Sequence, residues 1–400
     1  MKHRVAILFD NFGPYHLSRL RAADEVCELL AVEFGASSDE YAWKREQAAG
    51  LTSVTLNPAG PVSRMSDESF RKALGKALWD FQPEVVFVPG WGSGRALQSL
   101  QWCLEHRIPA VVMSESTPWD APRSRFSEWV KSRLLSLFSS ALVGGASHVR
   151  YLEQLGFSPQ RIFTGYDAVD NAFFAAEVSG ISPKNGDKRS FLASARFVPK
   201  KNLTFLLTAY ARYRSSSLQA GLNPWDLILL GDGPLRPQLE SLATELELEG
   251  SLQMPGFVQY PDLPRWYAKA SCFVHASLIE PWGLVVNEAM ASGLPVLVSN
   301  PCGCAADLVR EGVNGWTFDP MDQKALVDLM IRTAAAPDLL ASMGEASRCL
   351  IGEWGTERFA SGVLASTELA LGVGPLSAGI VNSVLLSLTL GRGALSRNLS

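Results

Sequence analysis

The feature of this sequence that most constrains its fold is the stretch of residues 275–295, which has the pattern of a loop followed by a short helix. Residues 284–292 are good helix formers, and the Gly-Leu-Pro that follows them is a typical C-terminal end signal. Apolar runs at residues 272–274 and 296–298 flank the stretch and have the pattern of buried parallel strands. This order of strand, loop, helix and strand predicts an α/β domain built on a parallel sheet.

Two carboxylates, Glu280 and Glu288, fall within these apolar surroundings. Burying a charge there is costly unless the charge is hydrogen-bonded. The amides at the predicted helix start are donors without intrahelical partners and favour an anion. They belong to Gly283, Leu284, Val285 and Val286. A ligand with both hydroxyls and a phosphate satisfies the carboxylates and the amides together, and a nucleotide sugar is such a ligand.

The run E-P-W-G-L-V-V-N-E-A-M-A-S-G-L-P-V resembles the E-x7-E signature of the retaining glycosyltransferases of family 4, which have the GT-B fold. The resemblance implies an α/β chain of two Rossmann-like, doubly wound parallel-sheet domains that face each other across a cleft. It also implies that Glu280 contacts the donor sugar and Glu288 the nucleotide ribose, with Trp282 and the helix-start amides binding the donor. A surface loop beside an ordinary amphipathic helix is the alternative interpretation.

Composition limits the classes of function. The chain has 400 residues, of which 47% are hydrophobic, so that it can bury a large core in two or three domains. A net charge of −4 argues against nucleic acid as a partner. The six cysteines have no zinc or disulfide spacing, and we expect free thiols in a reducing compartment. The first apolar run, residues 5–9, is too short for a signal peptide, and a cytoplasmic protein is expected.

Alternating strand and helix patterns over residues 5–155 predict a doubly wound parallel sheet in the first half of the chain. Ligands bind such sheets at the carboxyl ends of the strands, and the first strand ends in D-N-F-G-P-Y-H. The resemblance makes Gly13 in this turn a candidate for backbone contact with a donor phosphate, and a simple turn glycine is the alternative. His16 in the next helical turn is a candidate on the acceptor side, or a histidine packed on the helix face.

A second strand end carries S-E-S-T-P-W-D, in which Glu115 and Asp120 are acceptor-side candidates. Helix capping and loop structure explain these two carboxylates equally well. Residues 126–138 then form a helix pattern with basic and aromatic positions, including Lys131 and Trp129. Such a helix fits peripheral contact with an anionic membrane, or a packed helix with a solvated face.

In the second half, Arg196 and Lys201 lie five residues apart across a loop that follows a strand, so that both can point at one anion. The resembled family has R-x4-K here, which implies that these two cations bind the donor diphosphate. The run M-P-G-F-V ends another strand, and the resemblance implies that Phe257 and Val258 line the nucleotide pocket near the base. Asp307 replaces the glutamate that is usual in the family's later G-G-x-x-E segment.

The predicted organisation has a first domain over residues 1–180 and a second over residues 190–352, joined by a polar linker at residues 180–188. The resemblance implies that a helix over residues 353–371 crosses back to the first domain. Residues 372–400 are apolar and serine-rich, and we expect a disordered tail there.

These observations predict an enzyme that moves a hexosyl-type sugar from a nucleoside diphosphate donor, a UDP- or GDP-sugar, to a hydroxyl of a glycan or lipid-linked acceptor. Retention of anomeric configuration is implied by the resemblance. No D-x-D motif occupies a suitable position, so we expect no metal and no cofactor. The predicted catalytic residues are Arg196, Lys201 and Glu280, with the two cations and the helix-start amides stabilising the leaving diphosphate. The alternatives are an epimerase on the same fold and a non-catalytic nucleotide-sugar-binding subunit.

Overall fold

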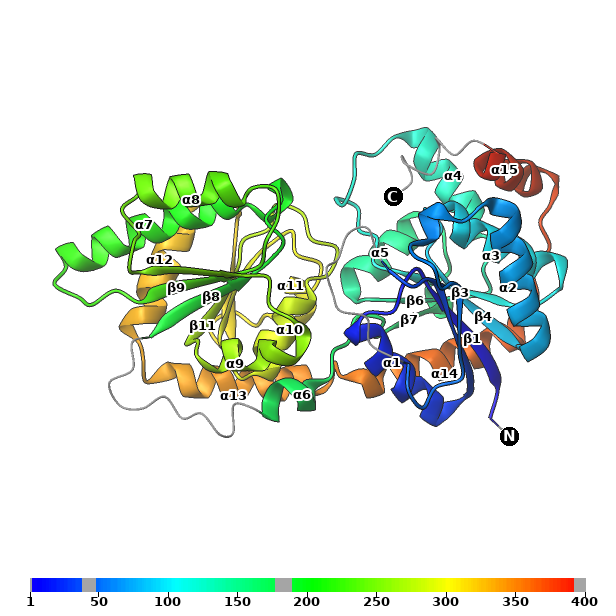
Figure 1. Cartoon of the computed structure of the whole chain (residues 1–400), viewed down its shortest axis with the longest axis horizontal. Helices are drawn as coiled ribbons and strands as arrows, with labels where there is room; N and C mark the ends of the chain where they lie inside the picture. Colours follow the sequence, from blue (N-terminus) through cyan, green and yellow to red (C-terminus); the bar gives the residue numbers. More distant parts are fainter. Residues whose placement is uncertain (1, 38–47, 177–188, 392–400) are drawn as a thin grey trace. The chain divides into compact units, whose positions relative to one another are not determined.

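A computed structural model describes residues 2–37, 48–176 and 189–391 of the chain. The chain divides into two compact units (Figure 1). Unit 1 comprises Met1–Ala168 together with Thr356–Ser400, and unit 2 comprises Val169–Gly355. In chain order, therefore, unit 2 is an insertion within unit 1.

Within its described residues, unit 1 contains a seven-stranded parallel sheet of order β3-β2-β1-β4-β5-β6-β7. Strand β1 (Arg4–Phe9) pairs on both sides, with Ile7 opposite Ala31 of β2 and Phe87 of β4. The strands are β1 (Arg4–Phe9), β2 (Glu28–Gly35), β3 (Ser53–Asn57), β4 (Val85–Pro89), β5 (Ala110–Ser114), β6 (Ser140–Val143) and β7 (Ile162–Thr164). Buried apolar side chains along these strands form cores on both faces of the sheet, as doubly wound folds require.

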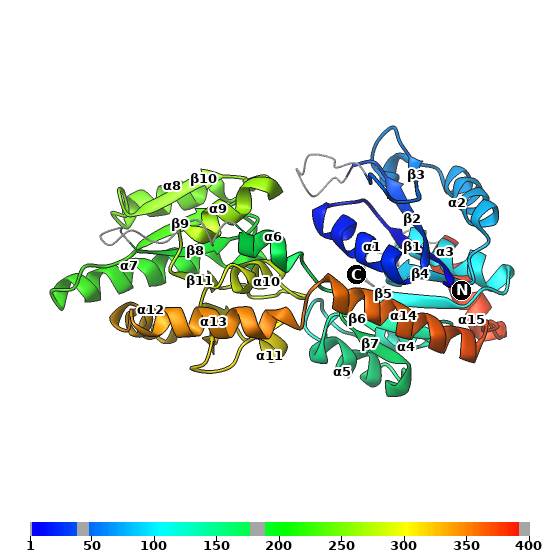
Figure 2. The same cartoon turned by 90° about the horizontal axis from the view of Figure 1, so that it is seen from below.

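Helices cover both faces of this sheet. One face is covered by α1 (Pro14–Val26) and α14 (Thr356–Val373), which lie side by side in Figure 2. The other face is covered by α2 (Asp67–Phe81), α3 (Gly94–Glu105), α4 (Arg125–Leu135), α5 (Ala146–Gln154) and α15 (Ile380–Gly391). Helix α15, the last helix described in the chain, therefore lies in the same layer as four helices from the first half of the chain.

Among the residues described for unit 2, six parallel strands form a sheet of order β10-β9-β8-β11-β12-β13. They are β8 (Ser190–Ser194), β9 (Asp226–Leu230), β10 (Leu252–Gly256), β11 (Cys272–His275), β12 (Val296–Ser299) and β13 (Gly315–Phe318). One face packs against α7 (Leu203–Gln219), α8 (Arg236–Glu245) and α12 (Gln323–Ala335). Across the sheet in Figure 1 lie α9 (Leu263–Ala268), α10 (Leu284–Ala291) and α13 (Leu339–Gly352). Two further short helices are α6 (Asn171–Ala176) and α11 (Ala305–Leu308).

Local sequence explains where the helices begin. Ser66 precedes α2 with extended backbone, and its hydroxyl accepts the Ser69 amide at 3.2 Å. Asp322 precedes α12, and its carboxylate accepts the Ala325 amide at 3.0 Å. Both are N-caps, which satisfy amides that the first helical turn leaves without partners.

The boundary between the units differs from the prediction. The chain enters unit 2 after Ala168 and leaves it after Gly355, instead of near residues 180 and 352. The reason is that Val169 forms a parallel bridge with Gly355, and that α6 packs against α9 and α10 of unit 2. The predicted linker at residues 180–188 lies outside the described residues.

The expected disordered tail is also corrected in part. Residues 380–391 form α15, which packs against α3 and α4 through the buried side chain of Leu386. The Nε of Arg133 donates to Oδ1 of Asn382 at 2.9 Å and ties the helix to α4. Apolar residues at helical spacing explain this packing. Residues 392–400 lie outside the described part of the chain.

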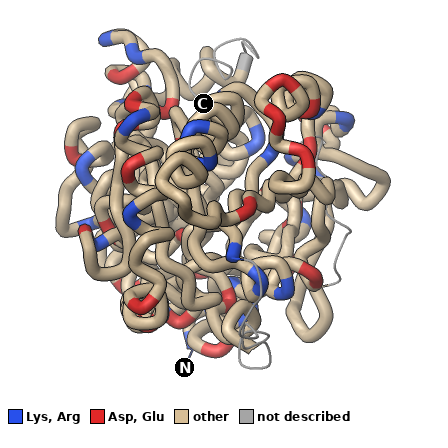
Figure 3. Tube along the Cα trace, turned by 90° about the vertical axis from the view of Figure 1, so that its left-hand side faces the viewer, with Lys and Arg blue, Asp and Glu red and all other residues tan. Residues whose placement is uncertain are grey.

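Charged residues of both signs are interspersed along the described trace (Figure 3). None of the helices in the described ranges combines the length and the apolar composition that a membrane crossing requires.

Candidate active site

The loop after β11 and the start of α10 are built around Gly283. Its φ of +102° lies in the left-handed region, which side chains other than glycine rarely adopt. A Cβ at this position would lie 2.8 Å from the Sγ of Cys302, so that the space also requires glycine. The amide of Val286 donates to the Gly283 carbonyl at 2.8 Å. Val286 is therefore removed from the set of helix-start amides that we expected to face an anion.

Glu280, in this loop, is the centre of a buried polar cluster. Its Oε2 accepts hydrogen bonds from the Nζ of Lys201, the Nε2 of His275 at 3.1 Å and the Oγ of Ser277 at 3.4 Å. The side chains of Lys201 and Glu280 are only 14% and 11% exposed. The structure thus brings together two of the three predicted catalytic residues, Lys201 and Glu280, and adds His275.

The charges in this cluster stabilise one another. Burial alone would raise the pKa of Glu280, but the Lys201 ammonium and His275 outweigh burial and hold that pKa well below its usual range. Burial alone would lower the pKa of His275, but hydrogen bonds with Cys302 and Glu280 raise it to about 9. At neutral pH the cluster is therefore a carboxylate between an ammonium and an imidazolium.

The loop that carries Arg196 and Lys201 is held in place by the strand order. Because β8 pairs with β11, the loops after these two strands are neighbours, and the Leu278 amide donates to the Lys200 carbonyl at 2.8 Å. The turn after β9 packs tightly beside the same loop, since a Cβ at Gly231 would lie 1.8 Å from the Ala195 carbonyl oxygen. Arg196 is half-buried in this loop.

Glu288 lies inside α10 and is fully buried. It accepts a hydrogen bond from the Tyr267 hydroxyl at 2.6 Å, and burial followed by the charge of Glu288 holds the pKa of Tyr267 well above its usual value. Trp282 is also buried, with its Nε1 donating to Asn287 at 2.9 Å. Its ring packs at 5.3 Å from that of Trp354. The Trp282 indole therefore forms part of the interior of unit 2, and only its backbone lies along the loop.

Two cysteines lie beneath this loop. The Sγ atoms of Cys302 and Cys304 are 3.4 Å apart, and the Cys302 thiol contacts the Trp282 carbonyl oxygen at 2.8 Å. Burial alone would raise the pKa of Cys302, but hydrogen bonds with Cys304 and His275 outweigh burial and lower that pKa below its usual value. The two residues predicted to lie near the base follow β10. Phe257 is 38% exposed, and Val258 is half-buried.

In unit 1, the turn that was predicted to contact a donor phosphate has its amides hydrogen-bonded to side chains of the protein. Gly13 is the N-cap of α1 with extended backbone, and its amide donates to Nδ1 of His16 at 3.0 Å. The neighbouring Phe12 amide donates to the buried Glu33 carboxylate at 2.7 Å. Burial, and then the charge of Arg19, lower the pKa of His16 to about 3, so that its ring is neutral and accepts this hydrogen bond. The Gly13 amide is therefore engaged by His16 instead of facing outward to a phosphate.

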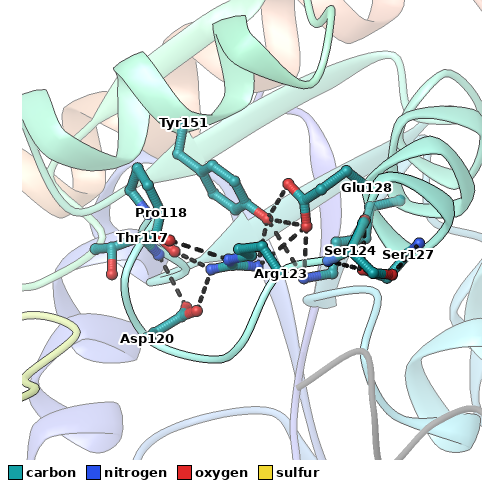
Figure 4. A network of polar contacts seen from close by, with 9 residues as sticks. Thr117, Pro118, Asp120, Arg123, Ser124, Ser127, Glu128 and Tyr151 are labelled. Carbon is teal, nitrogen blue, oxygen red and sulfur yellow. Dashed lines mark hydrogen bonds and ion pairs between the residues drawn. The ribbon is translucent and has the colours of Figure 1, made fainter.

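The acceptor-side candidates lie after β5, where Glu115 is half-buried. Asp120 accepts the Thr117 amide at 2.9 Å and pairs with Arg123 (Figure 4). Arg123 in turn donates to the Tyr151 hydroxyl at 2.5 Å. Asp120 thus helps to hold its own loop.

The structure corrects the predicted basic face of α4, because the same polar network holds one of its cations in the interior. Lys131 is 3% exposed and points inward, with its Nζ 3.3 Å from the Tyr151 hydroxyl and 3.4 Å from Glu128. Arg133 is engaged with Asn382 of α15. The exposed residues of α4 are instead Arg125, Phe126 and Trp129.

Sequence reasoning missed His275, Tyr267 and the two cysteines. His275 ends a buried strand five residues before Glu280, and this was the one signal available in the sequence. Among the side chains that the structure describes, no group of three or more His, Cys, Asp or Glu is arranged to hold a metal ion.

Comparison with known proteins shows that part of the chain, mainly its second half, is similar to glycosyltransferases. Residues 175–349 match the family model described as glycosyl transferases group 1. Sucrose-phosphate synthase of Zea mays is 31% identical over 166 residues, which cover 39% of this chain and 15% of that protein. The chain therefore spans about 15% of the length of this relative.

Solved structures resemble the fold of most of the chain. Sucrose-phosphate synthase from Thermosynechococcus elongatus has a TM-score of 0.69 and 18% identity, over 90% of this chain and 97% of that one. HepE of Anabaena in complex with UDP-glucose has a TM-score of 0.69 and 19% identity, over 93% and 99% of the two chains. The predicted fold class, GT-B with two Rossmann-like parallel-sheet domains, is confirmed.

Proposed function

We propose that this chain is a retaining glycosyltransferase of family 4 that moves a hexosyl-type sugar from a nucleoside diphosphate donor to an acceptor hydroxyl. The observation that carries the proposal is the Lys201–Glu280–His275 cluster at the start of α10, in a unit that matches glycosyl transferases group 1. HepE, of the same fold, has been solved with UDP-glucose, which supports a UDP-sugar as the donor.

In this proposal the charge that leaves with the diphosphate is stabilised by Lys201, Arg196 and the amides of Leu284 and Val285. Such preorganised donors are worth ~3–4 kcal/mol each in the transition state. Glu280 has two roles. It holds the Lys201 ammonium at the end of β8, and it meets the donor sugar near the reacting carbon. The reaction takes no cofactor, and the acceptor is a glycan or a lipid-linked sugar.

Donor-dependent release of nucleoside diphosphate tests the reaction. A panel of UDP-, GDP- and ADP-sugars is first screened by thermal shift, because ligand at 100 times its Kd adds ~2.7 kcal/mol of stability. Release of diphosphate on addition of acceptor is then measured, and the anomeric configuration of the product is assigned by NMR. A donor that shifts the melting temperature and is never consumed would identify a nucleotide-sugar-binding subunit instead.

Peripheral membrane contact, proposed through unit 1, rests on an exposed apolar surface of α4 and α15. Phe126 and Trp129 are 62% and 46% exposed, and their rings lie 6.1 Å apart. The outer side of α15 adds Ile380, Val381, Val384 and Leu388, which are 47–85% exposed. Arg125 supplies a cation beside them. Aromatic and aliphatic side chains next to a cation are typical of helices that lie in a membrane interface.

Vesicle sedimentation tests this contact. Replacing Phe126 and Trp129 by Ser should reduce binding to anionic vesicles at least ~10-fold, because each side chain buries apolar area at ~25 cal/mol per Å². Trp79→Ser on α2 is the matched control, since Trp79 is 63% exposed but belongs to another helix. Equal losses of vesicle binding in the control and in the double variant would rule out the proposed membrane-contact surface.

A further inference from the structure

The two cysteines of the Cys302-Gly303-Cys304 segment lie directly beneath the loop that carries Glu280. Their sulfur atoms are 3.4 Å apart and their side chains are 2% and 0% exposed. The backbone between them is tied to the loop, because the Gly303 amide donates to the Glu280 carbonyl at 3.0 Å and the Cys304 amide to the Trp282 carbonyl at 3.1 Å. Movement of either sulfur is therefore transmitted to the loop.

The environment of this pair differs from that of the other buried cysteines. Burial raises the pKa of the thiols of Cys27, Cys103 and Cys272. Cys302 instead has a thiol neighbour and the His275 ring beside it, and both stabilise its thiolate. A thiolate next to a second thiol is the arrangement in which a cysteine is oxidised and then resolved to a disulfide.

We propose that Cys302 and Cys304 form a dithiol that hydrogen peroxide oxidises to an intramolecular disulfide, and that this modification reduces sugar transfer at the neighbouring site. The effect on transfer rests on the proposed function, whereas formation of the disulfide does not. Neither cysteine belongs to the group of side chains assigned to the donor.

The reaction balances as follows. The Cys302 thiolate attacks one oxygen of hydrogen peroxide, the O–O bond breaks, and hydroxide leaves, taking up a proton to become water. Cys302 is then a sulfenic acid. The Cys304 sulfur attacks the Cys302 sulfur, forming the S–S bond and releasing the sulfenic oxygen as a second water with the Cys304 proton. Two thiols lose two electrons, and one peroxide is reduced to two waters.

Geometry connects the disulfide to the site. A disulfide requires an S–S distance of about 2.05 Å, so the two sulfurs must approach each other by ~1.4 Å. Both sulfurs abut the N-cap of α10, since a Cβ at Gly283 would lie 2.8 Å from Cys302 Sγ and 3.7 Å from Cys304 Sγ. In the disulfide, the Cys302 sulfur has neither a proton to donate to the Trp282 carbonyl nor a negative charge to place beside His275. Both losses disturb the loop that positions Glu280.

Mass spectrometry tests the modification on the whole chain. The protein is treated with hydrogen peroxide under native conditions, residual thiols are blocked with iodoacetamide, and the protein is digested. We expect the peptide with Cys302 and Cys304 to lose the mass of two hydrogen atoms and to escape alkylation, and dithiothreitol to restore it. Cys349 is exposed and serves as an internal reference for the dose of peroxide.

Activity supplies the second readout. Release of nucleoside diphosphate by the wild type should fall at least ~10-fold on oxidation, as expected for a catalytic group that is displaced, and should recover with dithiothreitol. The Cys302→Ser and Cys304→Ser variants should keep their own untreated rates after peroxide, and Cys349→Ser should respond as the wild type does.

Two results would overturn the proposal. One is a peptide that keeps both thiols, or that goes to sulfinic acid, at a peroxide dose that oxidises Cys349. The other is a complete disulfide with an unchanged rate of transfer. If the untreated protein consumes no donor, the proposed function fails, and the mass measurement still decides whether the disulfide forms.

Discussion

Replacing Glu280 by Gln removes the carboxylate on which the buried cluster depends, and leaves the size of the side chain unchanged. The Lys201 ammonium and the His275 imidazolium are then left in the cluster without a negative counter-charge. Removing one partner of a buried ion pair costs ~3–5 kcal/mol of the free energy of unfolding. Because Lys201 is 14% exposed and can turn partly toward water, we expect a loss near ~3 kcal/mol at pH 6.

The pH dependence of this loss follows from His275. Its pKa rises from 6.5 to about 9 on folding, which corresponds to about 3 kcal/mol at ~1.36 kcal/mol per pKa unit. A raised pKa stabilises the folded state fully below pH ~6.5, and this contribution is lost as the pH rises through ~9. Cys302 and Glu280 share the effect, so a part of it on the order of 1–2 kcal/mol should disappear in the variant. The difference between wild type and variant should therefore be larger at pH 6 than at pH 9.5 by that amount.

Urea unfolding at the two pH values, with dithiothreitol present, measures these differences by linear extrapolation. Ser277→Ala is the matched control, because Ser277 also donates to Glu280 but carries no charge, and its loss should cost only ~1 kcal/mol. Turnover is measured on the same samples below the melting temperature, where Glu280→Gln should lower kcat at least ~10²-fold. A loss of stability below ~1 kcal/mol at pH 6, or an equal loss at both pH values, would refute the reasoning.

Three further expectations concern the same unit. Transfer should keep its full rate in excess EDTA, because cations and amides of the chain are proposed to stabilise the diphosphate, and a strict requirement for Mg²⁺ or Mn²⁺ in the chemical step would contradict this. Glu288→Gln should raise the KM for donor with little change in kcat, and Tyr267→Phe should do so less; equal effects would mean that Glu288 acts only by holding Tyr267. Gly283→Ala should lower the free energy of unfolding by ~1–3 kcal/mol, since φ is +102° and Cys302 Sγ blocks the Cβ. Gly94→Ala in α3 is the control, and it should be neutral or stabilising because the space around Gly94 is open. An unchanged free energy of unfolding in Gly283→Ala would count against the described loop.

The parallel sheets could be predicted from the sequence because each buried strand is a short apolar run with a turn after it. The predicted runs at residues 272–274 and 296–298 lie within β11 and β12. The meeting of Lys201 with Glu280 also follows from topology. In a doubly wound sheet of this order the first strand lies beside the fourth, and β8 and β11 are those strands.

The partners of the buried charges could not be predicted, because each comes from a separate element. Tyr267 reaches Glu288 from α9, and Cys302 reaches His275 from the segment after β12. Sequence spacing carries no signal for such contacts. Lys131 illustrates the opposite error, since its amphipathic helix pattern suggested solvent, while a tyrosine and a glutamate from nearby positions hold its ammonium inside.

The position of α14 has a consequence for synthesis on the ribosome. This helix covers one face of the unit 1 sheet with α1, yet it is translated only after the whole of Val169–Gly355. At about 5–20 residues per second, that delay is ~10–40 s. Unit 2 is contiguous, and its two ends meet at the bridge between Val169 and Gly355, so it can close on itself during this interval. The nascent unit 1 meanwhile presents an uncovered apolar layer, and transiently exposed surface of this kind is prone to aggregation.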